Sequence, residues 1–468
     1  MDTKALRQKI LDLAIHGKLV PQDPNDEPAS VLLERIRTEK ERLIKEGKIK
    51  KGKKSAKTSD KPHYPYELPK GWKWCKLGDI AYVGTGATPL TTCKYYYENG
   101  NIAWINSSST KVPFIAKASN FITRKAIEET NCLVYPKGTL VIAMYGEGKT
   151  RGQISELLID AATNQACAAV CPYFEATKEY LKLFFEGNYL HIRALAEGGN
   201  QPNLSLGKIQ NYEIPLPPLD EQKRILEQAK KLLLQVENIE KEKEKNKNSI
   251  KQAKAKILNL AIHGKLVPHD LNDEPASELL RRINPKAEII SDNGHYQKLP
   301  KGWCLVKGKH IFNPMKSCKP IGETFKYIDI DAIDNKRQII SNVKILKVAN
   351  APSRASRFTQ KGDVVFSLVR PYLRNIAIVS ENDCIASTGF YVCHPTEVLL
   401  PKYCYHLMIS DYVINGLNEF MKGDNSPSIN KGDIDNWLFP IPPLAEQKRI
   451  VSKIEEIFSQ FDAIETAL

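Results

Sequence analysis

The stretch ILDLAIHGKLVP at residues 10–21 occurs a second time, with one substitution, as ILNLAIHGKLVP at residues 257–268. The similarity continues into DPNDEPASVLLERI at 23–36 and DLNDEPASELLRRI at 270–283. Because chance identity over blocks of this length is implausible, the chain contains an internal duplication. The duplication decides the fold, since both halves must build related structures.

Two further blocks repeat in the same order. LPKGW occurs at 68–72 and 299–303, and IPLPPLDEQKRI at 214–225 matches FPIPPLAEQKRI at 439–450. Weaker matches lie between them: KGTLVIAMYG (137–146) aligns with KGDVVFSLVR (361–370), and GNQPNLSLGKI (199–209) aligns with DNSPSINKGDI (424–434). The chain therefore reads as half a helix, a globular domain, a whole helix, a second globular domain and half a helix.

The central helix should begin after Pro217-Pro218, with Asp220 as N-cap or first-turn acid, and end at Gly264, with Pro268 just beyond. That gives about 45 residues, or about 65 Å of helix. Its apolar residues recur in two rows at alternating spacings of three and four, which is the pattern of a coiled-coil seam. A single solvated helix is the weaker interpretation, because so long an apolar stripe needs a partner.

The two terminal segments supply that partner. When the repeat maps them onto the central helix, the C-terminal and N-terminal segments together rebuild one copy of it. A twofold arrangement makes the helices antiparallel, places the globular domains at opposite ends and brings Met1 close to Leu468. The predicted seam residues are Ile225, Leu232, Val236, Ile239, Ile250 and Ile257 in the central helix, Leu6, Ile10 and Leu13 in the N-terminal segment, and Ile450, Ile454, Ile457, Phe461 and Ile464 in the C-terminal segment.

Each globular domain carries short β-type runs between turn signals, followed by helical stretches near 176–197 and 401–421. The predicted class is α+β: two domains of mixed α/β structure, joined by long helices in an antiparallel coiled coil with an internal pseudo-twofold repeat. The predicted boundaries are 1–63 for the N-terminal half of a distal helical region plus a basic linker, 64–218 for the first domain, 219–295 for the central helical region, 296–442 for the second domain, and 443–468 for the C-terminal half of the distal helical region.

The charge balance favours a polyanionic partner. Among 468 residues, 68 are Lys or Arg and 54 are Asp or Glu, which gives a net charge of +14. A basic protein without such a partner is the alternative. Residues 45–62 are rich in lysine and poor in apolar side chains, so they are interpreted as a linker that is either merely solvated or in contact with phosphates.

Several classes of protein are excluded. No apolar run approaches the ~20 residues that cross a bilayer, and the N-terminus leads into an amphipathic helix rather than a signal peptide. The ten cysteines are scattered, without a C-x-x-C pair or zinc-finger spacing. We therefore expect a cytoplasmic protein with reduced thiols and no metal site.

One motif suggests nucleotide hydrolysis. Residues 143–150 (AMYGEGKT) fit a relaxed phosphate-loop pattern after a predicted strand. A phosphate loop must open into a helix, however, and Arg151-Gly152-Gln153 is a poor helix start. The equivalent loop of the second domain has no Gly-Lys-Thr. An ATPase that depends on Lys149 is therefore the third interpretation, behind two binding functions.

No other catalytic arrangement stands out. The sequence shows no glycine-rich cofactor loop, no Ser/His/Asp or Cys/His arrangement and no nuclease-like carboxylate cluster. His16 and His263 recur at a predicted helix end, where a histidine caps the last carbonyls. We predict a chain that is not an enzyme and holds no cofactor itself.

The loops instead suggest binding to nucleic acid. Asn, Ser, Thr and Lys side chains on loops can contact phosphates and base edges, and the two domains carry different polar and basic loops. Two modules of different specificity are therefore expected. The predicted DNA-binding residues are Asn106, Ser108, Lys111, Tyr145, Lys149 and Arg151 in the first domain and Lys319, Arg354, Arg357, Arg370, Tyr372 and Arg374 in the second.

The chain resembles the specificity subunit of type I restriction–modification systems. The resemblance rests on the two PPL-x-EQKRI blocks, the AIHGKLVP repeats and three motifs of the first domain. Those three motifs are GTGATP (84–89), ATNQA (162–166) and GNQPNL (199–204). The second domain departs from the pattern, with ASTG at 386–389 in place of ATNQ.

The resemblance implies two target-recognition domains that each read one half of a bipartite DNA sequence, with the coiled coil setting the gap. It also implies two modification (methyltransferase) subunits docked on the helical regions, and restriction (motor and nuclease) subunits. Adenosylmethionine, ATP and magnesium would then belong to those partners. The rival interpretation is a coiled-coil interaction scaffold without DNA specificity.

Overall fold

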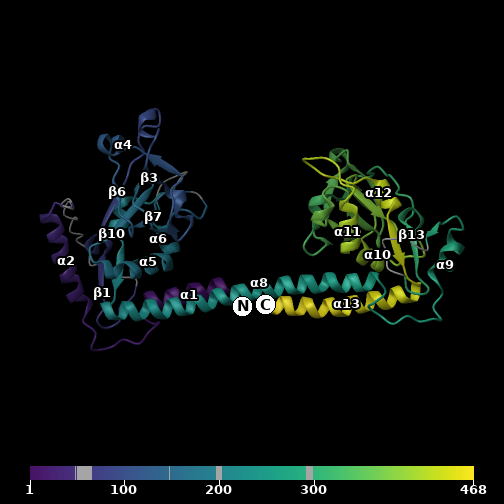
Figure 1. The fold of residues 1–468 in the computed structure, drawn as a ribbon, viewed down its shortest axis with the longest axis horizontal. Coiled ribbons are helices and arrows are strands. Elements are labelled where there is room, and N and C mark those ends of the chain that lie inside the picture. The colour runs from purple at the N-terminus through teal and green to yellow at the C-terminus, as the bar shows by residue number, and fades with distance from the viewer. Residues whose placement is uncertain (48, 50–65, 147, 197–202, 291–298) are drawn as a thin grey trace. The chain divides into compact units, whose positions relative to one another are not determined.

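The computed structural model describes residues 1–47, 49, 66–146, 148–196, 203–290 and 299–468. The chain divides into two compact units, unit 1 (Met1–Glu242) and unit 2 (Lys243–Leu468). Helix α8 (Leu219–Ile262) contributes its first part to unit 1 and the rest to unit 2 (Figure 1). Most of the predicted basic linker, and residues 199–202 of the GNQPNL motif, lie outside the described residues.

Unit 1 contains a five-stranded sheet in the order β2-β10-β7-β8-β4, a four-stranded sheet in the order β5-β3-β9-β6 and the pair β1-β11. Its helices are α1 (Thr3–Ile15), α2 (Ala29–Lys45), α3 (Leu77–Ile80), α4 (Arg124–Glu129), α5 (Lys178–Gly187), α6 (Tyr189–Ala194) and α7 (Leu206–Gln210). Its strands are β1 (Lys73–Lys76), β2 (Ala81–Thr85), β3 (Ile102–Ile105), β4 (Phe114–Ile115), β5 (Asn120–Ile122), β6 (Val134–Tyr135), β7 (Leu140–Ala143), β8 (Ile154–Leu157), β9 (Ala161–Thr163), β10 (Cys167–Pro172) and β11 (Glu213–Leu216).

The alternation of side chains along β7 builds two cores in unit 1. Leu140 and Ile142 join the core that includes α5 and the start of α8, whereas Val141 joins the core shared with the four-stranded sheet. A strand buried on both faces reads as a continuous apolar run, and this explains the sequence TLVIAM. The five-stranded sheet therefore packs against a hydrophobic core on each of its two faces.

Unit 2 arranges its strands in four sheets, in the orders β12-β13-β23, β17-β14-β21-β18, β20-β19-β22 and β15-β16. Its helices are α9 (Ala276–Ile283), α10 (Pro401–Met408), α11 (Asp411–Asn418), α12 (Lys431–Asn436) and α13 (Leu444–Ala467). Its strands are β12 (Ile289–Ile290), β13 (Cys304–Lys307), β14 (Thr324–Ile328), β15 (Ile333–Asp334), β16 (Ile339–Ile340), β17 (Lys344–Lys347), β18 (Ala355–Thr359), β19 (Val364–Ser367), β20 (Ile376–Ile378), β21 (Cys384–Ser387), β22 (Phe390–Cys393) and β23 (Leu438–Ile441).

Strand β19 is the counterpart of β7. Val364 and Phe366 join the core that includes α10 and α13, whereas Val365 joins a second core with β20 and β21 residues. Helix α10 is the counterpart of α5. Tyr180 on α5 donates to Pro215 O at 2.6 Å, and Tyr403 on α10 donates to Pro440 O at 3.3 Å.

In each unit a second helix runs antiparallel to α8 (Figure 1). In unit 1, Arg7 of α1 pairs with Glu240 at 3.6 Å, while Gln22, farther along the chain, donates to Glu221 at 3.1 Å. In unit 2, Lys254 Nζ of α8 lies 2.6 Å from Asp462 Oδ1 of α13. The predicted antiparallel helical pairing is therefore present within each unit.

The predicted seam residues differ in burial. Ile10, Ile225, Val236, Ile250, Ile450 and Ile454 are buried; Leu6, Leu13, Leu232, Ile239, Ile257, Ile457 and Phe461 are half-buried. Ile464, in the last turns of α13, is 51% exposed. Burial is thus deepest where α8 and its partners also meet the globular cores.

Equivalent contacts tie the start of each EQKRI helix to the segment that follows AIHGKLVP. Arg224 forms a bidentate pair with Asp26, and Arg449 forms one with Asp273. Both carboxylates are buried, with side chains 8% exposed. The structure therefore repeats this anchor, as the sequence repeat requires.

A buried glutamate lies beside each anchor. Glu221 accepts a hydrogen bond from Trp72 Nε1 at 2.9 Å, and Glu446 lies 2.8 Å from His269 Nδ1. Burial raises the pKa of both glutamates above the ordinary value. We call these anchors and glutamates, together with the antiparallel helix pair, the frame of each unit.

The fold class predicted from sequence is confirmed, and helix α8 begins and ends within two residues of the predicted positions. All ten cysteines lie in the described residues and are free thiols. None of the helices in the described part of the chain has both the length and the hydropathy that a bilayer crossing requires. The proximity of Met1 and Leu468 concerns both units together and stays a prediction.

Candidate DNA interface

The strongest candidate site is the end of the central strand in each unit. In unit 1, Met144 follows β7; its N–H donates to Ala166 O at 2.8 Å, and its carbonyl accepts from Leu204 N at 3.0 Å. In unit 2, Leu368 follows β19; its N–H donates to Gly389 O at 2.8 Å, and its carbonyl accepts from Ile429 N at 2.9 Å. The same pair of main-chain bonds therefore fixes the same corner of both units.

We call this corner, with the loops that meet there, the loop edge of each unit. The loop edge of unit 1 comprises residues 86–88, 105–108, 144–146, 148–153, 163–166 and 203–204. The loop edge of unit 2 comprises residues 354, 368–375, 387–389 and 425–429.

The polar motifs of unit 1 converge at its loop edge. Gly86 passes so close to Thr163 that an added Cβ would lie 1.7 Å from Thr163 O. Thr88 Oγ1 donates to Gln165 Oε1 at 2.7 Å on the surface, and Asn164 N donates to Ile105 O at 3.0 Å. The GTGATP turn and the ATNQ segment, far apart in sequence, therefore form one surface.

The loop after β7 carries three predicted site residues. Tyr145 is 39% exposed, Lys149 is exposed and Arg151 is half-buried. The loop is held through its carbonyls: Tyr189 donates to Lys149 O at 2.6 Å and Arg193 to Arg151 O at 3.2 Å. The described residues 148–153 form turns that lead into strand β8, so they do not provide the helix that a phosphate loop needs.

The remaining predictions in unit 1 lie on the 3₁₀ turn Ser107–Lys111. The Asn106 side chain is its cap and accepts from Ser108 N at 3.0 Å and from Ser108 Oγ at 2.6 Å. Lys111 is exposed at the end of the turn. Asn106 therefore shapes this loop, whereas Lys111 presents a charge to solvent.

In unit 2 the predicted residues Arg370, Tyr372 and Arg374 share one tight turn after β19. Tyr372 is 45% exposed. Arg370 Nη2 donates to Asn425 O at 2.7 Å, and Arg374 donates to Ile409 O at 3.2 Å and pairs with Asp411. Both guanidinium groups are thus engaged by unit 2 itself.

The other predicted cations of unit 2 lie on or beside β18. Arg354 is exposed and its carbonyl accepts from Thr388 N at 2.8 Å, which places it on the loop edge. Arg357 is half-buried within β18, and Lys319 is exposed just after Cys318, whose N–H bonds to Ser356 O at 2.9 Å. Arg354 is therefore the cation best placed beside the turn.

Sequence reasoning missed Thr88, Gln165 and Leu373, which are exposed on the loop edges. Thr88 and Gln165 belong to motifs that were recognised, so the motifs themselves were the available signal. Leu373 carried no signal, because an apolar residue is normally assigned to a core.

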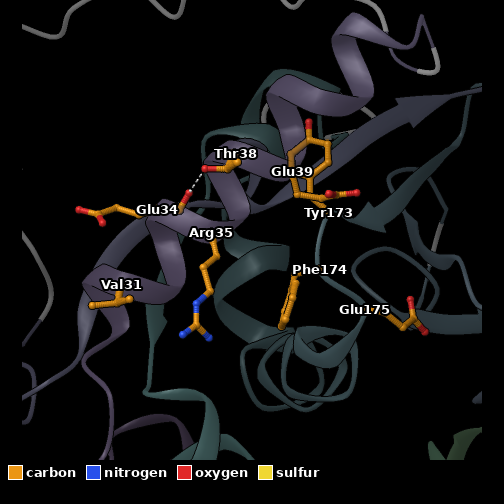
Figure 2. Close-up of a pocket in the computed structure, with 8 residues that line it drawn as sticks. All are labelled: Val31, Glu34, Arg35, Thr38, Glu39, Tyr173, Phe174 and Glu175. Atoms are coloured by element: carbon orange, nitrogen blue, oxygen red, sulfur yellow. Dashed lines mark hydrogen bonds between the residues drawn. The ribbon is translucent and has the colours of Figure 1, made fainter.

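A separate groove of about 550 Å³ in unit 1 lies between α2 and residues 173–175 (Figure 2). Its lining includes Glu34, Glu39 and Glu175 with Arg35, together with the rings of Tyr173 and Phe174. An excess of carboxylates repels a phosphate backbone. This groove is therefore not assigned to the DNA interface. Within the described residues, no three His, Cys, Asp or Glu side chains gather as a metal site.

The chain matches the family model described as the type I restriction modification DNA specificity domain, over residues 69–251 and 314–468. It is 28% identical to the type I restriction enzyme EcoAI specificity subunit of Escherichia coli, over 97% of this chain and 88% of that protein. It is 22% identical to the MjaIX specificity subunit of Methanocaldococcus jannaschii, over 84% of this chain and 88% of that protein.

Two solved structures share the fold. The HsdS subunit from Thermoanaerobacter tengcongensis aligns with a TM-score of 0.50 and 20% identity, over 86% of this chain and 93% of that one. A chain from a study of complex assembly and conformational transition in the type I R-M system aligns with a TM-score of 0.55 and 19% identity, over 86% of this chain and 94% of that one.

Proposed function

Because the chain belongs to the type I restriction–modification DNA specificity family, we propose that each of its two units reads one half of a bipartite DNA target through its loop edge. The chain is the non-catalytic DNA specificity subunit of such a system. Each loop edge would contact base edges in the major groove, and nearby lysines and arginines would contact phosphates.

One observation carries this proposal. The same two main-chain bonds fix Met144 and Leu368 in their units, yet the loops that follow have unrelated sequences. A corner that repeats and loops that differ are what two readers of different half-sites require. An interaction scaffold without DNA specificity gives no reason for the loops to differ while their anchors stay the same.

The partners follow from the family. We propose that two modification subunits dock on the helical regions and bring adenosylmethionine, and that restriction subunits supply the ATP- and magnesium-dependent steps. A methyltransferase must extrude its target adenine from the stack. The specificity chain would hold the duplex during that step, in the cytoplasm where the genome is accessible.

The domain roles complete the proposal. Residues 64–218 and 296–442 would be the two target-recognition domains. The regions 1–63, 219–295 and 443–468 would set the gap between half-sites. Inserting one heptad within 241–248 should lengthen the gap and leave both half-sites unchanged.

The deciding experiment is methylation sequencing of the genome in cells that express the modification subunit, with and without this chain. A split motif that is methylated on both halves only when this chain is present supports the proposal and identifies the target. If no such motif arises while the chain still co-purifies with the modification subunit, the scaffold alternative is favoured.

A further inference from the structure

The turn at residues 370–374 leaves two large side chains partly exposed. Tyr372 is 45% exposed and Leu373 is 40% exposed, whereas Pro371 beside them is buried. Leaving large apolar side chains in water is unfavourable. Two of them side by side at the tip of one turn form a small exposed surface that a partner could cover.

The backbone on both sides of this tip is in the left-handed region. Arg370 has φ +48° and Arg374 has φ +57°, although both carry a Cβ. This conformation is unfavourable for such residues and persists only where surrounding contacts hold it. Contacts with the rest of unit 2 must therefore hold the turn in this conformation.

The holding contacts come from the arginines themselves and from the main chain. Arg370 reaches Asn425 O, and Arg374 reaches Ile409 O and Asp411, at the start of α11. Arg370 N also donates to Pro427 O at 2.8 Å. These hydrogen bonds and the ion pair fasten both ends of the turn to unit 2. Tyr372 and Leu373 remain as its exposed residues.

The tip stands on the loop edge. A chain of main-chain bonds runs from Arg354 O to Thr388 N at 2.8 Å and from Gly389 O to Leu368 N at 2.8 Å. Arg354 is exposed and available for a phosphate. The corresponding corner of unit 1 presents Tyr145 with the exposed Lys149, so DNA is the occupant that charge and repeat symmetry favour.

We propose that Tyr372 and Leu373 form an apolar probe that contacts bases of one half-site, and that Arg370 and Arg374 are positioning residues that hold the probe rigid. In the major groove, an aromatic or aliphatic side chain can pack on the methyl group of thymine. This assignment rests on the proposed function, because it needs DNA at the loop edge of unit 2.

The test uses the full chain in complex with the modification subunit and reads the methylated motif. Tyr372→Ala with Leu373→Ala should relax the base preference in one half of the motif and leave the other half and the gap unchanged. Tyr145→Ala, the matched variant in unit 1, should affect the opposite half, and Tyr372→Phe should retain the original motif.

The outcomes separate the two levels of the proposal. If the double variant methylates the original motif at the original level, the probe assignment is wrong while the proposed function stands. If the unaltered chain yields no motif, the proposed function itself fails.

If the double variant loses methylation, DNA binding by the purified complex is measured instead. Binding to the original motif weakened about five- to hundredfold, with binding to unrelated DNA retained, supports the probe. An equal loss on unrelated DNA contradicts it.

The role of the arginines has its own readout. For the purified complex, Arg370→Ala and Arg374→Ala should lower the Tm and leave the salt dependence of DNA binding unchanged. Arg354→Ala, the matched cation, should reduce the slope of log K against log salt by about one. A reduction of that size for Arg370→Ala or Arg374→Ala would show a phosphate contact and overturn the positioning role.

Discussion

The loops at residues 144–153 (described except for 147) and 368–375 start from equivalent corners of the two units, and different contacts hold them. In unit 1, Tyr189 and Arg193 of α6 reach out to carbonyls of the loop, which turns at glycines with positive φ. In unit 2, the arginines of the loop reach out to carbonyls and a carboxylate of the unit. In unit 1 the donor side chains belong to the surrounding helix, whereas in unit 2 they belong to the loop.

This contrast shows which contacts the two duplicated units still share and which contacts differ between them. The main-chain bonds of Met144 and Leu368 correspond, and so do the pairs Arg224–Asp26 and Arg449–Asp273. Frame substitutions should therefore have equal effects in the two units. Substitutions in or behind the loops should have unequal effects.

The largest expected effect tests the equality of the frames. Gly17 and Gly264 both have φ +65°, and an added Cβ would lie 2.4 Å from Pro69 Cγ in one unit and 2.3 Å from Pro300 Cγ in the other. Left-handed strain and collision together should cost about 3 kcal/mol for Gly17→Ala and for Gly264→Ala. Urea unfolding followed by hydrogen exchange in peptides of each unit measures both.

A control isolates the backbone contribution. Gly47 has φ +69° with no atom near its Cβ position, so Gly47→Ala should cost only about 1 kcal/mol. Suppose that the losses of unfolding free energy in Gly17→Ala and Gly264→Ala differed by more than the loss in Gly47→Ala. The two frames would then not be equivalent.

The second prediction concerns a buried residue that differs between the two units. His406 on α10 occupies the position of Leu183 on α5, given the match of Tyr403 with Tyr180. Burial lowers the pKa of His406 from 6.5 to about 4, with Glu455 and Lys402 as the nearby charges and Phe458 as the ring from α13.

Because the unfolded chain binds this proton at a higher pH than the folded chain, stability is complete above pH 6.5 and is lost as the pH falls toward 4. The loss approaches about 3 kcal/mol. His406→Leu should remove it, and urea midpoints of unit 2 between pH 7.5 and 4.5 measure the change. An unaltered pH dependence in this variant would assign the acid sensitivity to other groups.

The third prediction returns to the frame. Asp26→Asn and Asp273→Asn each remove the charge from a buried bidentate pair and should cost about 2 kcal/mol in both units. The controls Glu27→Gln and Glu274→Gln alter exposed pairs with Arg35 and Arg282 and should leave the urea midpoint unchanged. A cost confined to one unit would break the correspondence.

The smallest effect separates side chain from backbone in the loop of unit 2. Arg370→Gly and Arg370→Ala lose the same hydrogen bond to Asn425, but only glycine relieves the left-handed strain. Arg370→Gly should therefore be more stable than Arg370→Ala by about 1 kcal/mol. Equal unfolding midpoints would mean that the turn relaxes once the arginine side chain is removed.

The sequence predicted the frame better than the loop edges. Heptad spacing and the Pro and Gly punctuation determined α8 to within two residues, because helix periodicity and chain stops are local properties. The duplication predicted which segments correspond. These signals need no knowledge of tertiary contacts.

The structure of the loop edges depends on tertiary contacts that cannot be predicted from the residue types of the loops. Basic character suggested Arg370 and Arg374 as phosphate contacts, yet both side chains bind unit 2 itself. The side chain of Asn106, a predicted DNA-binding residue, caps the 3₁₀ turn Ser107–Lys111, and its contact with DNA stays a prediction. The bonds that fix Met144 and Leu368 are main-chain bonds, and these leave no trace in residue type.

Those main-chain bonds have a consequence for how new target preferences can arise. A bond between N–H and C=O groups survives almost any substitution of the residues that carry it. Mutations at Tyr372 and Leu373 can therefore change what the tip touches without loosening its attachment through Leu368 and Ile429. New side chains at these two positions should therefore leave the folding of unit 2 undisturbed, so that a change of surface need not carry a cost in stability.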